Sequence, residues 1–245
     1  MKRRSVVIAI PIAIAIAIVL SVSFTSCSPG YVIRAAWEEA RILARRRSIS
    51  DMLNDPTLDM TTRAKLELVV QARSFAARDL ALDVGDSYTS FSDIGRDTLA
   101  LVLSASPVNR LAAHTWWFPI VGRVPYKGFF SREAAEREAR QLEERNYDTY
   151  LRPTAAFSTL GWFPDPLLST VLGQDSVGLV ETVVHEVTHN TLFVSGHVKF
   201  NESFANFVGS VGAIEFFCGR GYDESLCDLA TARWHDTVRF SVFLD

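Results

Sequence analysis

The feature that most restricts the fold is a helical run of valines that also carries two histidines, VGLVETVVHEVTH from residue 177. The valines recur every three or four residues, at Val177, Val180, Val183, Val184 and Val187. This spacing predicts one buried side of a helix between Asp175 and Val194, with Asp175 or Ser176 as its cap. His185 and His189 are four residues apart, so their imidazoles lie on one face, close enough to share a metal ion. Glu186 lies about 100° round the helix and is predicted to reach a water at the metal without being a ligand.

A third ligand is needed, because a catalytic zinc keeps three protein ligands and one open position. His197 falls eight residues after His189, whereas the metzincin pattern places its third histidine six residues after the second. Glu202 opens a predicted helix in which small residues recur on one side, at Ala205, Gly209 and Ala213. Its expected core residues are Phe204, Phe207 and Val208. Since the small side would let this helix pack closely on the first, we favour Glu202, the gluzincin arrangement, and keep His197 as the alternative.

The segment before the metal helix is rich in aromatic and turn residues, as in TWWFPIVGRVPYKGFF, residues 115–130. It predicts short strands around an aromatic core, although a substrate pocket could use the same residues. Ser131 caps a predicted helix that runs to about Asn146, and residues 147–153 and 155–161 have the composition of strands. Asp165, between two prolines, is predicted to form a turn rather than to bind a ligand.

The N-terminus has the form of a secretory signal, with MKRR followed by an apolar run and small residues. Thr25, Ser26 and Cys27 resemble the lipobox of bacterial lipoproteins, in which the cysteine is lipidated and becomes the new N-terminus. We therefore predict a signal peptide over residues 1–26 and lipidation of Cys27. The alternative is an uncleaved anchor, since residues 6–24 approach the ~20 residues that span a bilayer. Either reading places residues 28–245 outside the cytoplasm.

The charge balance of the chain limits the kinds of partner that it can bind. The chain has 25 Lys and Arg against 28 Asp and Glu, and three of the cations lie in residues 1–26. The excess of acidic residues in the rest of the chain argues against nucleic acid as a partner.

Residues 27–104 are rich in helix formers and predict a helical N-terminal region, broken near residues 54–56 and 84–86. Residues 105–245 then form the catalytic region. Cys218 and Cys227 are an even pair in an oxidising compartment, either disulfide-bonded or free.

Four sequence blocks in order resemble the predicted zinc aminopeptidase family of bacterial lipoproteins: WWFPIVGRVPYKGFFS, AFSTLGWFPDPLLSTVL, HEVTH and FNESFANFVG. The resemblance covers nearly all of residues 27–245. It implies a helix-rich α+β, gluzincin-like fold with a small β-sheet, a Zn²⁺ ion held by His185, His189 and Glu202, and Glu186 as catalytic base. It also implies a peptide substrate and a membrane-anchored lipoprotein that faces the periplasm. Family members tend to continue with further helical sequence, so the chain is expected to be truncated at its C-terminus.

The expected activity is metal-assisted peptide hydrolysis with Glu186 as general base. An endopeptidase, an amidase or a non-catalytic zinc-binding lipoprotein are the alternatives. Candidate donors to the developing oxyanion are Tyr126, Tyr222 and His235. The Gly-x-Met-Glu-Asn segment that recognises a free N-terminus in the best-known gluzincin aminopeptidases is absent. Glu181, one turn before His185, could point toward the site, but on such a helix it is more often solvated or capping.

Overall fold

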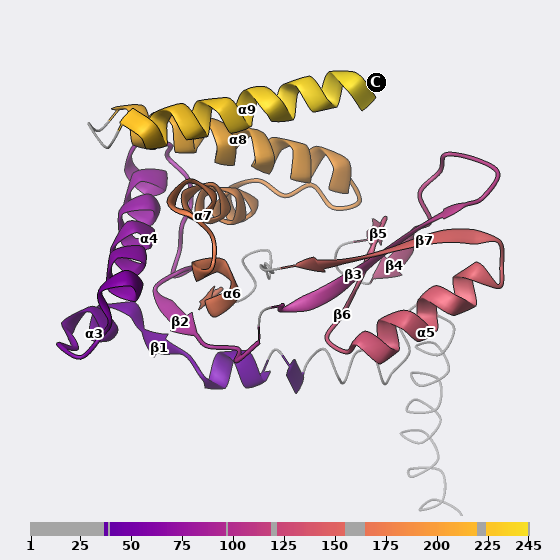
Figure 1. Ribbon diagram of the computed structural model, residues 1–245, viewed down its shortest axis with the longest axis horizontal. Helices are drawn as coiled ribbons and strands as arrows, with labels where there is room; N and C mark the ends of the chain where they lie inside the picture. Colours follow the sequence, from indigo (N-terminus) through magenta and orange to yellow (C-terminus); the bar gives the residue numbers. More distant parts are fainter. Residues whose placement is uncertain are drawn as a thin grey trace, which may run out of the picture. The chain divides into compact units, whose positions relative to one another are not determined.

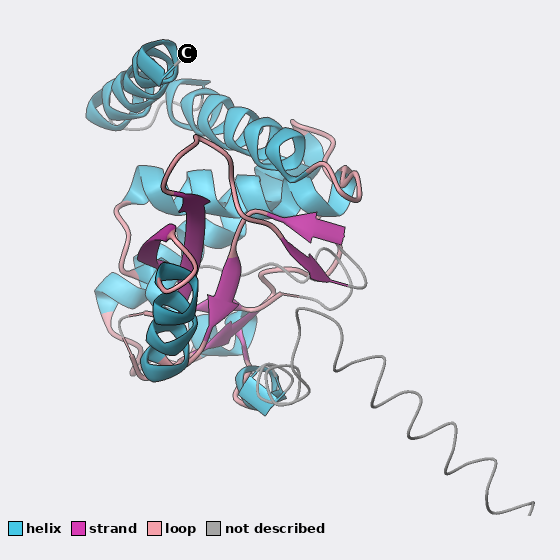
Figure 2. Ribbon diagram, turned by 90° about the vertical axis from the view of Figure 1, so that its right-hand side faces the viewer, coloured by secondary structure: helices cyan, strands magenta, loops and turns pink. Residues whose placement is uncertain are grey.

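The structure, a computed structural model, describes residues 37–38, 40–96, 98–118, 122–154, 165–219 and 224–244 (Figure 1). It has long helices and short strands, as Figure 2 shows. The predicted helix-rich α+β class is therefore confirmed. The chain divides into two compact units, each built from two stretches: residues 1–41 with 101–152, and residues 42–100 with 153–245. The predicted end of the signal peptide at residue 26 and the predicted boundary of the catalytic region after residue 104 stay predictions.

The first unit contains a three-stranded sheet, a two-stranded sheet and one described helix of twelve residues. Strands β6 (Lys127–Phe129), β3 (Ala100–Pro107) and β7 (Tyr147–Thr154) lie in that order, and β4 (Trp116–Phe118) pairs with β5 (Gly122–Val124). Helix α5 (Arg132–Glu143) begins at Ser131, whose side chain accepts a hydrogen bond from the Ala134 amide. On α5, Glu138 accepts hydrogen bonds from Trp116 Nε1 at 3.0 Å and from the buried Lys127 at 2.8 Å. These contacts fasten the helix to the strands.

The predicted strands and helix of this unit are confirmed between residues 115 and 153. Trp116 and Phe129 belong to its apolar core, so the aromatic segment is in part core, as expected. Trp117, which points to the other face of β4, is 40% exposed. The strand predicted at 155–161 lies outside the described residues.

The second unit is built from helices around a small sheet. Strand β2 (Ser90–Ser92) lies between β1 (Arg47–Ser48), to which it is antiparallel, and β8 (Leu167–Leu168), to which it is parallel. The helices are α3 (Ile49–Asn54), α4 (Met60–Arg78), α6 (Ser169–Leu172), α7 (Ser176–Thr191), α8 (Val198–Gly219) and α9 (Glu224–Leu244). Helix α7 packs against α4, α8 and α9 (Figure 1).

The predicted helical region at residues 27–104 is therefore only partly helical. The break at residues 54–56 is confirmed, because α3 ends at Asn54 and α4 begins at Met60. Strands β1 and β2 and the start of β3 also lie in this segment. Strands of two or three residues show no measurable alternation in sequence, since their stability comes from partners far along the chain.

The small side of α8 packs directly on α7. Ala205 and Ala213 are fully buried, and a Cβ on Gly209 would lie 2.9 Å from the Glu181 carbonyl oxygen and 3.2 Å from His185 Cβ. The predicted close packing of the two helices is thus confirmed. The prediction that Phe207 belongs to the core is wrong: it is 49% exposed and packs edge-on against Trp234 of α9. Phe204 and Val208 are only half-buried.

Candidate metal centre

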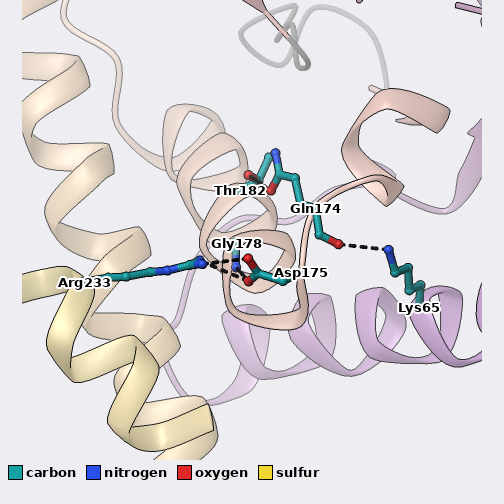
Figure 3. Close-up of polar contacts among 6 residues, drawn as sticks. All are labelled: Lys65, Gln174, Asp175, Gly178, Thr182 and Arg233. Carbon is teal, nitrogen blue, oxygen red and sulfur yellow. Dashed lines mark hydrogen bonds and ion pairs between the residues drawn. The ribbon is translucent and has the colours of Figure 1, made fainter. Parts of the chain in front are cut away.

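Helix α7 is fixed at its N-terminus by polar contacts from two other helices (Figure 3). Its cap is Asp175, as predicted, whose carboxylate accepts a hydrogen bond from the Gly178 amide at 3.0 Å. The same carboxylate accepts two hydrogen bonds from Arg233 of α9, at 2.6 and 3.0 Å. Lys65 of α4 donates to the carbonyl oxygen of Gln174 at 2.9 Å. Because both partners of the Asp175–Arg233 contact are charged, this contact is stronger than a neutral hydrogen bond and helps to fix the start of α7.

The structure brings together His185, His189 and Glu202. The Nε2 atoms of the two histidines are 3.3 Å apart. The Glu202 carboxylate approaches His185 Nε2 to 3.6 Å and His189 Nε2 to 3.9 Å. One ligand atom from each residue lies within 4.8 Å of the others. Two imidazole nitrogens and a carboxylate that converge on one point are a donor set suited to a divalent metal such as zinc. The residues therefore fit a metal ion.

The protonation of the two histidines differs. Burial lowers the pKa of His185, but hydrogen bonding to Glu202, the charges of Glu186 and Glu202, and hydrogen bonding to Asn206 outweigh it and raise the pKa above its usual value. Burial and the neighbouring His185 lower the pKa of His189. The Nδ1 atom of His189 is buried and has no hydrogen-bond partner among the described residues. In both rings the Nε2 atom is the one that lies near the Glu202 carboxylate, where a metal ion would bind.

His197 is not part of this group. Its ring is exposed and its Nδ1 lies 3.0 Å from the carbonyl oxygen of Ser195. The loop before α8 is closed instead by the buried Asn201, whose side chain accepts from the Val194 amide and donates to the Val194 carbonyl, both at 2.9 Å. Asn201 directly precedes Glu202 in α8, so the hydrogen bonds between Asn201 and Val194 also help to fix the position of Glu202.

Glu186 lies beside the metal group, next to a second carboxylate. Burial is the main cause that raises the pKa of Glu186 to about 7; the charges of Glu202 and Asp165 act in the same direction, and His185 opposes them. Asp165 is only 5% exposed, and its carbonyl oxygen accepts the Tyr88 amide at 2.8 Å. Asp165 was expected only to form a turn. Its buried carboxylate instead contributes to the electrostatics of the site.

Of the other candidates from the sequence, Glu181 and His235 are not part of the group formed by His185, His189 and Glu202. The charges that act on Glu181 come from Arg233 and Asp175, and Ser210 hydrogen-bonds to it, so its carboxylate belongs to the N-terminal end of α7. Burial is the main cause of its raised pKa. His235 is exposed on α9. Tyr126 belongs to the first unit, and Tyr222 lies outside the described residues.

The two cysteines in the C-terminal part of the chain form a disulfide bond. Cys218 at the end of α8 is disulfide-bonded to Cys227 of α9, with Cα atoms 4.9 Å apart. The bond fixes the start of α9, from which Arg233 reaches α7. Cys27 and the predicted signal peptide lie outside the described residues. None of the described helices has both the length and the apolar composition that crossing a membrane requires.

One family of known proteins matches this chain over nearly its whole length. The model of the family described as "Putative aminopeptidase" matches residues 30–244. The chain belongs to that family. No curated protein and no solved structure matches it significantly. Membership in the aminopeptidase family supports a peptidase, and the group of His185, His189 and Glu202 is its candidate metal centre.

Three residues around this aminopeptidase-family site were not found from the sequence. Asn206 follows Glu202 by one helical turn and faces His185, so its spacing was a usable signal. Asn201, next to Glu202, could have been found only from the loop that it closes. Tyr88 lies in a turn almost 100 residues before Glu186, whose charge acts on the Tyr88 hydroxyl, and no local pattern predicts such a long-range effect.

Proposed function

We propose that the chain is a zinc-dependent aminopeptidase that holds its metal with His185, His189 and Glu202. The single observation that carries the proposal is the convergence of the two Nε2 atoms, 3.3 Å apart, on the carboxylate of Glu202. Histidines with no shared ligand are not expected to direct their Nε2 atoms at one another, least of all on a helix that is largely buried. Membership in a family described as "Putative aminopeptidase" supports the reaction class.

The residues around the metal position divide the chemistry among them. When bound, a zinc ion lowers the pKa of its water and polarises a carbonyl group. Glu186, which is not among the three ligands, accepts a proton from the attacking water and passes it to the leaving amine. A pKa of about 7 in the metal-free protein places Glu186 near the value that suits a group which must both take up and release a proton. Asn206, one helical turn after Glu202, also contributes to the raised pKa of His185.

We further propose that the protein works as a lipoprotein of the bacterial cell envelope, anchored through Cys27 and facing the periplasm. The basic residues, the apolar run and the small residues before Cys27 support this location. The disulfide between Cys218 and Cys227 also suits an oxidising compartment.

The test combines metal analysis with a pair of peptides. Purified protein should contain about one zinc ion per chain and should hydrolyse a peptide with a free N-terminus faster than its acetylated copy. His189→Ala should lose both the metal and the activity, whereas the matched control His197→Ala should keep both, because His197 lies outside the group. Equal rates on the two peptides would indicate an endopeptidase. Metal-free, inactive wild-type protein would refute the proposal.

A further inference from the structure

The loop between β3 and β4, residues 108–115, exposes apolar side chains at the surface of the first unit (Figure 1). Leu111 is fully exposed, and Val108 is 57% exposed. The loop has a closed base, because the His114 amide donates a hydrogen bond to the Ala105 carbonyl at 2.8 Å. The structure therefore holds these apolar side chains in water on a fixed loop, where they lose the stabilisation that burial would give them.

The ribbon formed by β4 and β5 continues this surface. Trp117 is 40% exposed and lies on the face of β4 opposite the buried Trp116. Its partner on β5 is Arg123, an exposed residue whose guanidinium donates to the Thr115 hydroxyl at 3.4 Å. Since Thr115 is the last residue of the loop, this contact joins the exposed face of the ribbon to the loop.

The surface made by the loop and the ribbon is cationic, although the chain as a whole is acidic. Residues 98–131 contain no aspartate or glutamate, whereas the whole chain has 28 of them. The loop contributes Arg110 and the ribbon contributes Arg123, both exposed. The turn between α5 and β7, whose Asn146 carbonyl accepts from the Val108 amide at 3.1 Å, carries acidic as well as basic residues. The excess of positive charge therefore belongs to the loop and the ribbon.

Exposed aliphatic and aromatic side chains among arginines suit the boundary between lipid and water. Leucine and valine can enter the edge of the acyl region, and tryptophan is enriched at the level of the headgroups. An arginine side chain can lie along apolar surface while its guanidinium reaches the phosphate groups. Near a negatively charged bilayer, each arginine strengthens binding by about fivefold. The charge of this surface is thus complementary to anionic phospholipid.

The proposed lipid anchor would keep this surface close to a membrane. Residues 37–41 belong to the same unit as the loop. Trp37 follows Cys27 by ten positions, a distance of at most about 33–36 Å even in a fully extended chain. Acyl chains on Cys27 would therefore hold the start of the first unit within that distance of the bilayer.

We propose that residues 108–115 and the exposed face of the β4–β5 ribbon form a contact surface for anionic phospholipid. Leu111 enters the bilayer interface, and the guanidinium groups of Arg110 and Arg123 pair with lipid phosphates. The inference rests on the proposed location in the cell envelope, and it is independent of the metal and of peptide hydrolysis. It gives the first unit a second attachment to the membrane, in addition to the lipid on Cys27.

The test places a nitroxide spin label on Leu111→Cys in the full chain, reconstituted into vesicles of phosphatidylethanolamine and phosphatidylglycerol. The new thiol is the one available for labelling, because Cys218 and Cys227 are bonded to each other and Cys27 is acylated in the proposed lipoprotein. The label should be more accessible to oxygen, which concentrates in the bilayer, than to a water-soluble nickel chelate. The same label on Val70→Cys, at a 45% exposed valine of α4, supplies the reference in water.

Charge reversal then tests the class of lipid. Arg110→Glu combined with Arg123→Glu should return the Leu111 label to water, as should vesicles of phosphatidylcholine alone. The matched pair Arg78→Glu and Arg239→Glu, at exposed arginines of the second unit, should leave the label in the lipid. A label that stays in the lipid after the first pair of changes would overturn the role of anionic headgroups.

Two other results would overturn the inference as a whole. On anionic vesicles, a Leu111 label as accessible to nickel as the Val70 label would show that the loop lies in water. A label shielded from both oxygen and nickel would show that the loop is covered by protein. If mass spectrometry finds no acyl group on Cys27, the proposed anchor fails, and the labelled protein with Cys27→Ser, mixed with the same vesicles, still decides whether the loop binds lipid.

Discussion

Gly209→Ala tests whether the metal centre depends on the close approach of α7 and α8. The added Cβ would lie 2.9 Å from the Glu181 carbonyl oxygen, 3.2 Å from His185 Cβ and 3.4 Å from the backbone nitrogen of His185. All three atoms belong to the backbone of α7 or are attached directly to it. None of them can rotate out of the way, so the two helices must separate.

The size of the separation follows from ordinary contact distances. Restoring about 3.5 Å between the new methyl group and the Glu181 carbonyl requires a displacement of roughly half an ångström. Metal–ligand distances tolerate only about 0.2 Å, and Glu202 is on α8 while His185 is on α7. We therefore expect zinc affinity to fall on the order of ten- to a hundredfold. For the free energy of unfolding, the gain of about 1 kcal/mol in helix propensity opposes about 1–3 kcal/mol of overpacking.

Two other glycines of α8 supply matched controls. At Gly212 the added Cβ meets only side-chain atoms, Leu80 Cδ1 at 3.0 Å and Val184 Cγ1 at 3.2 Å, while at Gly219 it meets nothing within 4 Å. Zinc affinity, measured by competition with a chromophoric chelator, should follow the order Gly219→Ala, then Gly212→Ala, then Gly209→Ala at the lowest. Urea unfolding of the metal-free proteins reports stability separately. A Gly209→Ala protein with wild-type zinc affinity would refute the reasoning.

Four further predictions concern the chemistry of the site and the anchor. Glu186→Gln should abolish hydrolysis while zinc stays near one per chain by elemental analysis, and loss of the metal would show a structural role instead. Glu202→Ala should lower zinc affinity far more than His197→Ala in the same chelator competition, because only Glu202 belongs to the ligand group; a larger loss for His197 would overturn the assignment. Zinc affinity should fall on acidification, because the raised pKa of His185 lets a proton compete for Nε2 at a higher pH than at an ordinary histidine; calorimetry across a pH series would show affinity lost as the pH falls through that pKa, and a flat profile would contradict it. Cys27→Ser should accumulate as unprocessed precursor without acyl label, whereas soluble, cleaved protein from the unmutated sequence would rule out the lipoprotein reading.

The candidate metal ligands could be brought together from the sequence alone because their geometry is mostly local. The spacing of His185 and His189 fixes their relation within one helix, and the structure places both on α7. Glu202 was harder, because it required that a second helix pack closely on the first. The small side of α8 carried that information, and Gly209 shows why: only a residue without a side chain permits the observed approach.

Other parts of the site could not be predicted, because their contacts are long-range. Asp165 between two prolines has the local sequence of a turn, and only the assembled fold shows that its carboxylate is buried near Glu186. Phe207 was placed in the core by its apolar character. It is instead half-exposed against Trp234, because the side of α8 toward α7 is already filled by small residues.

The charges around the site explain why metal and protons must compete for it. Among the described groups, the charges that act on Glu186 come from Glu202, Asp165 and His185, with no lysine or arginine among them. Three carboxylates near two histidines are costly to ionise together in a partly buried place. The metal-free protein lowers that cost by taking up protons, which is the meaning of the raised pKa values of Glu186 and His185. A divalent cation supplies the same neutralisation and displaces those protons. On the proposed function, the bound metal would lower the pKa of Glu186 and so increase the fraction of the base that is ionised near neutral pH.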